Sequence, residues 1–255
     1  MIPIHPKFVE RPWGRKGLGP LFPQAPGDQA IGEVWLEPPT GSELPLLKFI
    51  FTEQKLSVQV HPGDEYARLH HSGANGKTEA WYILEARPES RLGLGLKRRL
   101  SREEARQACL SGEIENLLDW RAVQPGDVIF VPAGTIHAIG EGLTLFEIQQ
   151  KSDITYRLYD YGRPRALHLE HGLAVSRLEP FEEASTRRRL GDNRELLVES
   201  PWFRLELCSV PPETEPEASG RWRAAVGLDG SAWALAPGEP LPLRSGRWLI
   251  ATGPR

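Results

Sequence analysis

The chain has 255 residues, of which 40% are hydrophobic and 25% charged, so it is not a disordered protein and can bury a sizeable core. Its net charge is −3 with both signs scattered along the chain, which leaves no basic footprint for nucleic acid. The two cysteines, Cys109 and Cys208, are too few for a disulfide framework and favour a reduced, cytoplasmic setting. We recognise no signal peptide and no apolar segment long enough to span a bilayer, so no membrane partner is expected.

Frequent turn residues divide the first two thirds of the chain into short apolar stretches. The predicted strands there are Leu46–Phe51, Leu56–Val60, Ala80–Leu84, Val128–Val131 and Leu143–Ile148. Many short strands between turn signals favour a β-sandwich or barrel. Ser101-Arg-Glu-Glu104 matches a capping box, which predicts a helical insertion over Ser101–Trp120 that Gly112 divides into two short helices.

The composition changes after about residue 164. The stretch Leu167–Arg189 is charged and predicted as loop, and strands return at Glu195–Val198, Phe203–Val210, Arg223–Leu228 and Trp248–Thr252. The polar segment PPETEPEASG is predicted as a loop between two of these strands. We therefore predict two domains, residues 1–165 with the helical insertion near 101–120, and a smaller β domain over 166–255 without metal ligands.

Two segments carry polar side chains where a strand core is expected. In LSVQVHPGDE, strand alternation places Gln59 and His61 on one face and the two valines on the other. In GKTEAWYIL, Glu79 shares its face with Trp81 and Ile83. A carboxylate buried there is costly without a cation or hydrogen-bond partners, so these side chains are expected to converge on a metal.

A third segment, GDVIFVPAGTIHAIG, supplies the more specific signal. A hairpin turn at Gly126-Asp127, a strand to Val131 and a bend at Pro132–Gly134 aim His137 inward. Imidazole, carboxylate and amide oxygen together suit zinc and other divalent first-row metals, and leave room for a substrate oxygen. The other histidines lie in charged, loop-like contexts and are predicted to be solvated: His5, His70, His71, His168 and His171.

The spacing from Gly126 to His137 matches the second conserved motif of the cupin superfamily. The wider sequence resembles type I mannose-6-phosphate isomerases, specifically their short bacterial branch. Six blocks in order carry the resemblance: LPLLKFIF, LSVQVHPGDEYA, GKTEAWYIL, LSGEIENLLDW, GDVIFVPAGTIHAIG and EIQQKSDITYRLYDYGR. They cover residues 10–165 strongly, whereas the last third agrees only in general character.

The resemblance implies an all-β fold of two cupin (double-stranded β-helix, jelly-roll) barrels, the second smaller, with a helical insertion. It implies one zinc ion per chain, held by Gln59, His61, Glu79 and His137. It also implies an active-site arginine at Arg157, substrate-contacting lysines at Lys48 and Lys77, and an acidic position at Glu147. Ligand chemistry alone leaves manganese, cobalt or iron open.

Two features depart from the general patterns. The usual cupin motif places its acidic ligand a few residues after the histidines, whereas Glu79 lies eighteen residues after His61, as in the isomerases. The C-terminal part is short even for the small branch.

The reaction implied is interconversion of mannose 6-phosphate and fructose 6-phosphate through an enediol(ate), with negative charge stabilised by the metal and Arg157. Lys48 and Lys77 are the predicted phosphate partners, and Lys77 is also placed among the catalytic residues with Glu147 and Arg157. The residues do not identify the general base: Glu147 is one candidate, and a metal-bound water or hydroxide is another.

Two other functions compete with isomerisation. A metal-containing cupin could bind a sugar or sugar phosphate as a sensor, without turnover; retention of the lysines, Glu147 and Arg157 beside the ligands favours turnover. An iron-type cupin oxygenase ranks last because its ligand set is usually richer in histidine. A monomer or homodimer acting on a small sugar phosphate is expected.

Overall fold

The computed structural model describes residues 1–209, 220–240 and 246–254 and is mostly antiparallel β-structure. The chain forms two compact units made of interleaved segments, residues 1–49, 146–150 and 184–255 in unit 1, and residues 50–145 and 151–183 in unit 2. The boundary predicted after residue 165 divides the chain once and stays a prediction. Among the described residues, no helix is both long and apolar enough to cross a membrane.

Unit 2 contains the sheet that carries most of the predicted site. Its strand order is β12-β5-β10-β7-β8, and the strands are β5 (Val58–Val60), β7 (Arg91–Leu96), β8 (Leu118–Ala122), β10 (His137–Ile139) and β12 (Tyr156–Tyr159). The register places Gln59 directly opposite both His137 and Arg157. Directly paired residues share a face of an antiparallel sheet, so these three side chains lie on one face. In another sheet, of six strands, β6 (Glu79–Ala86) pairs with β9 (Val128–Val131) and Glu79 aligns with Val131.

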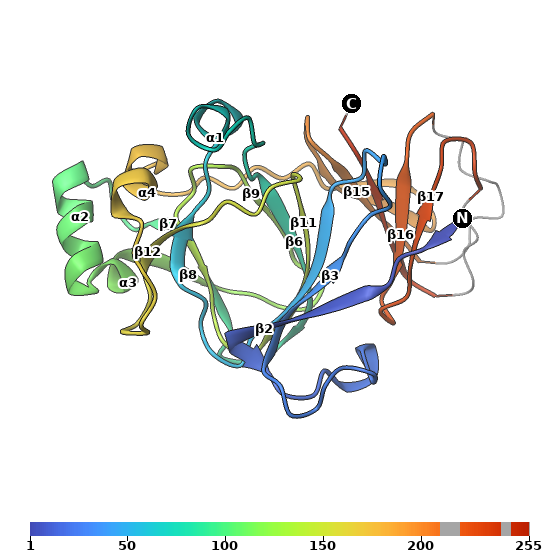
Figure 1. Ribbon diagram of the computed structural model, residues 1–255, viewed down its shortest axis with the longest axis horizontal. Coiled ribbons are helices and arrows are strands. Elements are labelled where there is room, and N and C mark those ends of the chain that lie inside the picture. Colours follow the sequence, from blue (N-terminus) through green and yellow to red (C-terminus); the bar gives the residue numbers. More distant parts are fainter. Residues whose placement is uncertain (210–219, 241–245, 255) are drawn as a thin grey trace. The chain divides into compact units, whose positions relative to one another are not determined.

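Helices cover the opposite face of the five-stranded sheet (Figure 1). They are α2 (Arg102–Ser111), α3 (Ile114–Leu117) and α4 (Leu169–Val175), while α1 (Asp64–His70) follows β5. Val58 and Val60 are fully buried in a cluster that includes Leu173 of α4. The alternation of β5 therefore does two things at once, because its valines bind the helices and its polar residues face the other way.

Unit 1 is built on a seven-stranded antiparallel sheet. Its order is β1 (Ile2–Pro3), β17 (Ala232–Leu235), β16 (Arg223–Gly227), β18 (Trp248–Thr252), β15 (Arg204–Cys208), β14 (Arg194–Glu199) and β13 (Arg188–Gly191). The strands β2 (Pro6–Arg15) and β3 (Ile31–Leu36) pair with each other, and a 3-10 turn, η1, spans Gly19–Leu21. The strands β4 (Leu46–Phe51) and β11 (Leu143–Gln149) each pass through both units. Edge-to-face contacts of Phe22, Phe49 and Phe146 form part of the unit 1 core.

Most predicted strands are confirmed, with β4, β9 and β18 at the predicted bounds and the others within a few residues. The all-β class and the helical insertion are also confirmed. Ser101 accepts a hydrogen bond from the N–H of Glu104, whose side chain accepts one from the N–H of Ser101, and Gly112 ends α2 with φ +86°. Val210 and the part of PPETEPEASG up to residue 219 lie outside the described residues.

Two predictions about secondary structure are wrong. The helical insertion is predicted to reach Trp120, but the chain enters β8 at Leu118. Within β8, Trp120 lies opposite Gly93, whose missing side chain leaves space for the indole ring. The predicted loop Leu167–Arg189 contains α4 and the start of β13. The short α4 has weak local signals and is held by burial of Leu173 and by close packing of Gly172 on Leu158.

The capping box makes a stability prediction. Ser101→Ala removes the acceptor for the Glu104 N–H, and we expect the free energy of unfolding to fall by about 1 kcal/mol in urea titration. Ser111→Ala in the same helix loses only 3.4 Å contacts and serves as the matched control. Equal stability of the two variants would show that the box contributes nothing measurable.

Candidate metal centre

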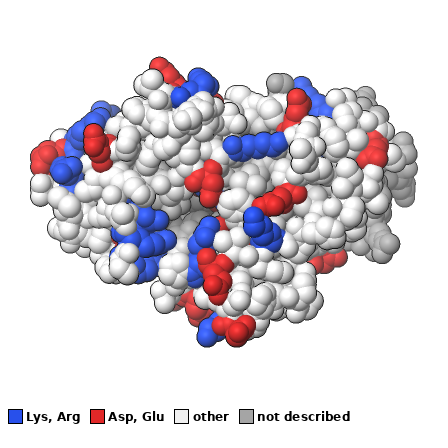
Figure 2. Space-filling model, in the orientation of Figure 1, with Lys and Arg blue, Asp and Glu red and all other residues white. Residues whose placement is uncertain are grey.

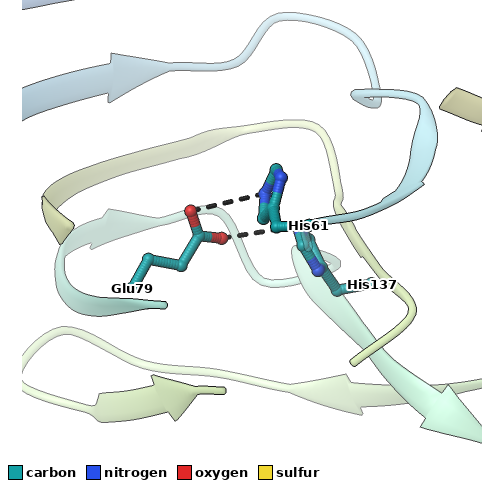
Figure 3. Close-up of side chains that lie close together, drawn as sticks. All are labelled: His61, Glu79 and His137. Carbon is teal, nitrogen blue, oxygen red and sulfur yellow. Dashed lines mark ion pairs between the residues drawn. The ribbon is translucent and has the colours of Figure 1, made fainter. Parts of the chain in front are cut away.

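Three buried side chains from different segments of unit 2 converge in Figure 3. The Nε2 atom of His61 lies 3.5 Å from Oε2 of Glu79, and the Nε2 atom of His137 lies 3.3 Å from Oε1 of the same carboxylate. Their ligand atoms all lie within 4.8 Å of one another. Across the described ranges, no second group of three histidine, cysteine or acidic residues meets the same criterion.

Backbone hydrogen bonds tie the three segments together. The bend after β9 returns to β5, because the Gly134 N–H donates to the carbonyl of His61 at 2.9 Å. Gly134 has φ +86°, and a Cβ there would lie 2.9 Å from the carbonyl of Val175, so glycine suits both the conformation and the space. The Ala133 N–H donates to the hydroxyl of Thr78, next to Glu79. The inward direction of His137 is thus confirmed, and it is set by main-chain contacts.

The second nitrogen of each imidazole has a carbonyl partner. His61 Nδ1 lies 2.9 Å from the carbonyl oxygen of Ile154, and His137 Nδ1 lies 2.9 Å from that of Thr135. Each Nδ1–H donates to its carbonyl, so each Nε2 presents a lone pair toward Glu79. Sequence reasoning missed these two acceptors, since main-chain oxygens leave no signal in residue type.

Both imidazoles are held neutral. Burial lowers the pKa of His137 to about 3. Burial, followed by repulsion from the Lys77 ammonium, lowers the pKa of His61 below its usual value. Neutral imidazoles with free Nε2 lone pairs are the form in which histidine binds a metal.

The carboxylate of Glu79 is the charged centre of the group. Burial acts to raise its pKa, but the positive charge beside it, chiefly the Lys77 ammonium, outweighs burial and holds the pKa of Glu79 well below its usual range. The Lys77 ammonium forms an ion pair at 3.0 Å with Oε2 and lies 3.3 Å from Nε2 of His61. Neither oxygen of Glu79 has a hydrogen bond of normal geometry with a described residue.

These features fit a divalent cation. Two lone pairs and a carboxylate face one another in a buried space, where they repel unless a positive charge lies between them. Two imidazoles and one carboxylate are also a donor set that divalent first-row metals accept. The group can therefore bind a metal ion, and it does not by itself select one metal.

Gln59, the fourth predicted ligand, lies beside His137 and turns its amide nitrogen, and not its oxygen, toward that imidazole. Its Nε2 lies 3.2 Å from Nε2 of His137, whereas its Oε1 accepts a hydrogen bond from the Ser57 hydroxyl at 3.2 Å. A glutamine binds metal through Oε1, so ligation by Gln59 requires rotation of its amide group.

Arg157 lies on the same face of the sheet as Gln59 and is held by the segment that follows β12. Its Nη1 donates to the carbonyl of Ala166 at 2.8 Å, and its Nε is 3.8 Å from Asp160. Its backbone N–H donates to Nδ1 of His168, and its carbonyl accepts from the His168 N–H. The guanidinium of Arg157 therefore forms an ion pair with the buried carboxylate of Asp160.

Lys48 and Glu147 lie together in unit 1. Both side chains are buried, with exposed fractions of 2% and 3%, and the ammonium lies 3.8 Å from Oε1 of Glu147. The ammonium also lies 4.2 Å from the ring centroid of Trp35, within the range of a cation–π interaction. Lys77 is buried as well, so neither lysine is the solvent-exposed side chain that their local sequences would suggest.

The prediction of solvated histidines is confirmed for His5, His70 and His171, which are exposed, and wrong for His71 and His168, which are half-buried. His71 Nε2 is 2.6 Å from the hydroxyl of Tyr156, and His168 binds the backbone of Arg157. Residue context alone did not reveal these partners because α1 and α4 bring them from distant segments.

The sheets and this centre define an all-β protein of the cupin type with a candidate metal site. No family model matches the chain. A probable mannose-6-phosphate isomerase of Bacillus subtilis, GmuF, is 35% identical over 222 residues, which are 72% of this chain and 70% of the relative. The mannose-6-phosphate isomerase of Streptococcus mutans is 36% identical over 218 residues, 82% of this chain and 68% of that protein. The chain belongs to the mannose-6-phosphate isomerase family, which is a family of enzymes.

Solved structures support the same assignment. The crystal structure of the mannose 6-phosphate isomerase from Bacillus subtilis aligns with a TM-score of 0.80 at 26% identity, covering 100% of this chain and 97% of that one. A phosphomannose isomerase variant from Salmonella typhimurium aligns with a TM-score of 0.75 at 16% identity over 100% of both chains, which shows a shared fold.

We predict that the protein loses its metal when the imidazoles of His61 and His137 are removed. The double replacement of His61 and His137 by alanine should abolish stoichiometric metal in the purified protein, measured by elemental analysis, because only Glu79 then remains of the three ligands. Wild-type protein should gain about 2.7 kcal/mol of stability at a metal concentration 100 times its Kd, and the double variant should gain none.

His5→Ala, which removes an exposed histidine, is the matched control and should keep full metal content. Unchanged metal content in the double variant would exclude this group as the binding site.

Proposed function

We propose that this chain is a cytoplasmic, zinc-dependent aldose–ketose isomerase that interconverts mannose 6-phosphate and fructose 6-phosphate as a monomer or homodimer. The observation that carries the proposal is the buried carboxylate of Glu79 facing the two neutral imidazoles of His61 and His137. The relatives named as mannose-6-phosphate isomerases supply the substrate. Free, buried Cys109 and Cys208 agree with a reducing compartment.

Moving a proton between adjacent carbons of a sugar creates an enediol(ate), whose negative oxygen must be stabilised. A bound divalent cation supplies Lewis-acid stabilisation of that charge. Gln59, His61, Glu79 and His137 would hold the cation, with Gln59 turning its amide oxygen toward it.

Arg157 supplies a second positive charge on the same sheet face. Its guanidinium stays charged at neutral pH and its backbone is fixed on both sides by His168, so it can orient the sugar and stabilise negative oxygen without reorganising.

Lys77 is the group best placed to exchange a proton or hydrogen bond with a sugar oxygen. Its ammonium already lies within 3.3 Å of both His61 and Glu79, so it is anchored beside the candidate metal. In this proposal Lys77 binds substrate and donates to an oxygen of the isomerising carbons.

Glu147 and Lys48 form the remaining part of the proposal. A buried carboxylate near an ammonium can act as a base or can orient a neighbouring group, and Lys48 can donate to a substrate oxygen. We assign Glu147 to catalysis and Lys48 to substrate binding.

A sensor that binds the sugar phosphate without turnover is the second candidate. It shares the metal group and Arg157, but it has no need for the buried Lys77 ammonium beside Glu79. Turnover distinguishes the two functions directly.

The first test is conversion of mannose 6-phosphate to fructose 6-phosphate, coupled to a fructose 6-phosphate assay, before and after chelation. Activity should be lost on chelation and return with zinc, because a cation held by these residues would supply the Lewis-acid stabilisation that the reaction needs. A folded, metal-loaded protein without turnover would contradict the isomerase and favour the sensor.

Replacement of Arg157 separates its charge from its shape. Arg157→Gln should lower kcat by about 100-fold or more, as expected for loss of a charged group that stabilises the transition state. Arg157→Lys should recover part of that loss, and Arg91→Gln, at an exposed position of β7, is the control. A kcat of Arg157→Gln equal to that of the control would remove Arg157 from the mechanism.

A further inference from the structure

The guanidinium of Arg157 can stabilise negative oxygen only if it is held in place before the reaction begins. Arg157 lies on β12, which is the outermost strand of the five-stranded sheet of unit 2. A strand at the edge of a sheet has N–H and C=O groups on its outer side that no neighbouring strand binds. Pairing with β5 therefore leaves the outer side of β12 to be held by another part of the chain.

His168 binds both main-chain groups of Arg157 on that outer side. The N–H of His168 donates to the carbonyl of Arg157 at 2.7 Å, and Nδ1 of His168 accepts a hydrogen bond from the N–H of Arg157 at 3.1 Å. Two residues earlier, the carbonyl of Ala166 accepts a hydrogen bond from Nη1 of Arg157 at 2.8 Å. Three hydrogen bonds thus join one residue of the edge strand to a short segment that runs beside it.

We propose that His168 is a positioning residue of the isomerase. Its neutral imidazole holds the main chain of Arg157, and through it the guanidinium, where that charge stabilises negative oxygen. The inference rests on the proposed function, because it concerns how one residue of that mechanism is held. In this proposal His168 acts through Arg157 and does not touch the substrate.

The hydrogen bond to Nδ1 is the part of this arrangement that depends on residue type and on protonation. The N–H of His168 and the carbonyl of Ala166 belong to the main chain. A neutral imidazole accepts at Nδ1 when its proton is on Nε2, whereas an imidazolium carries a proton on both nitrogens and cannot accept. Protonation of His168 would therefore leave the N–H of Arg157 without its acceptor.

His168 is itself fastened on both sides. The turn that leads to it from β12 is held by Asp160, which is 2% exposed and accepts hydrogen bonds from Arg165 at 2.6 and 2.7 Å. On the other side, the N–H of Gly172 in α4 donates to the carbonyl of His168 at 2.8 Å. The imidazole is therefore attached to a fixed segment and can serve as a support for Arg157.

The surroundings of His168 favour its neutral form. Burial, followed by repulsion from Arg157 and then from His171, lowers the pKa of His168 below its usual value of 6.5. Figure 2 shows Lys and Arg side chains gathered at the lower left of the molecule, where Figure 1 draws β12 and the loop that follows it. At neutral pH the imidazole is thus uncharged and able to accept the hydrogen bond.

The titratable groups packed around His168 come from three elements. They are Arg157 and Tyr156 of β12, His171 and Glu170 of α4, and Tyr66, His70 and His71 of α1, which reach His168 through Tyr156 and His171. Glu170 is exposed. The two charges that act on the pKa of His168 are both positive, so protonation adds like charge to this group.

The first test uses the full, metal-loaded chain and kinetics with mannose 6-phosphate at about pH 8, where histidine is neutral. His168→Ala removes the acceptor and should lower kcat about tenfold, with KM and metal content within about threefold, because Arg157 acts on the transition state. His168→Asn places an amide oxygen where Nδ1 lies and should keep kcat within about threefold of the wild type. His168→Gln, whose oxygen lies one carbon farther out, should not restore kcat.

His171→Ala is the matched control. It removes another histidine of α4, which is exposed and whose Nδ1 contacts the hydroxyl of Tyr66. Its kcat should equal that of the wild type. Equal kcat values for His168→Ala and His171→Ala would overturn the inference, and so would a His168→Asn variant as slow as His168→Ala.

The pH dependence supplies a readout that a merely structural role would not change. As the pH falls through the lowered pKa of His168, below 6.5, the wild type loses its acceptor while the asparagine amide keeps it. The ratio of kcat in His168→Asn to kcat in the wild type should therefore be constant above neutral pH and rise in acid. Samples with equal metal content are compared at each pH. A ratio that stays constant down to about pH 5 would overturn the inference.

A measurement on unaltered protein covers the case in which a variant does not fold. The main-chain N–H of Arg157 should be protected from hydrogen exchange at neutral pH, relative to an unstructured peptide, in NMR of the metal-loaded chain. That protection should decrease in acid, as His168 becomes protonated. An unprotected N–H at neutral pH would overturn the inference.

The two proposals fail separately. Protection of the Arg157 N–H that is lost in His168→Ala, in a protein without turnover, would contradict the isomerase and still assign His168 as the residue that fixes Arg157. Turnover with a kcat that is insensitive to His168→Ala would contradict the positioning role alone.

Discussion

The carboxylate of Glu79 is the constraint around which the candidate site is organised. The carboxylate is buried and faces the lone pairs of two neutral imidazoles. Burying its negative charge there costs free energy unless a positive charge lies beside it. Lys77 supplies one charge and a divalent cation would supply more. The main-chain contacts of His61 and His137 then become intelligible, because they hold both rings in the one orientation that directs Nε2 at the carboxylate.

In the five-stranded sheet of unit 2, the same strands contribute one face to the hydrophobic core and the other face to the candidate site. Val58 and Val60 bury their side chains against the helices, while Gln59 between them faces the row that contains His137 and Arg157. The apolar face can therefore provide folding energy without intruding on the polar face. A substitution on one face changes the packing of the helices, and one on the other changes the site, although the two positions are adjacent in sequence.

The convergence of three side chains on one buried centre was predictable because each lies in a segment with a strong local signal. His61 alternates with valines, Glu79 interrupts an apolar run, and His137 follows a Gly–Pro–Gly spacing. Other parts carried no such signal. β7 contains two glycines and lacks the pattern of a strand, yet Gly93 fits its place closely because a Cβ there would lie 3.0 Å from Cδ1 of Leu118. The carbonyl partners of His61 and His137 and the ion pair of Arg157 with Asp160 depend on backbone geometry, which residue types do not encode.

The chain between His61 and Glu79 contains α1 and is closed at its base by hydrogen bonds. The number of residues between these two side chains therefore does not set the distance between them. The Lys77 N–H donates to the carbonyl of Pro62 at 2.9 Å, and the Gly76 N–H donates to Asp64 Oδ1 at 2.8 Å, so the chain leaves and returns at one point. Ser72 and Gly73 form an exposed turn at the far end of this excursion, both with positive φ. Residues inserted at that turn would lengthen a loop whose base is already fastened. The number of residues between His61 and Glu79 can therefore change while the two side chains stay in place. For this reason the number of residues between two candidate cupin ligands is a poor measure of their distance in space.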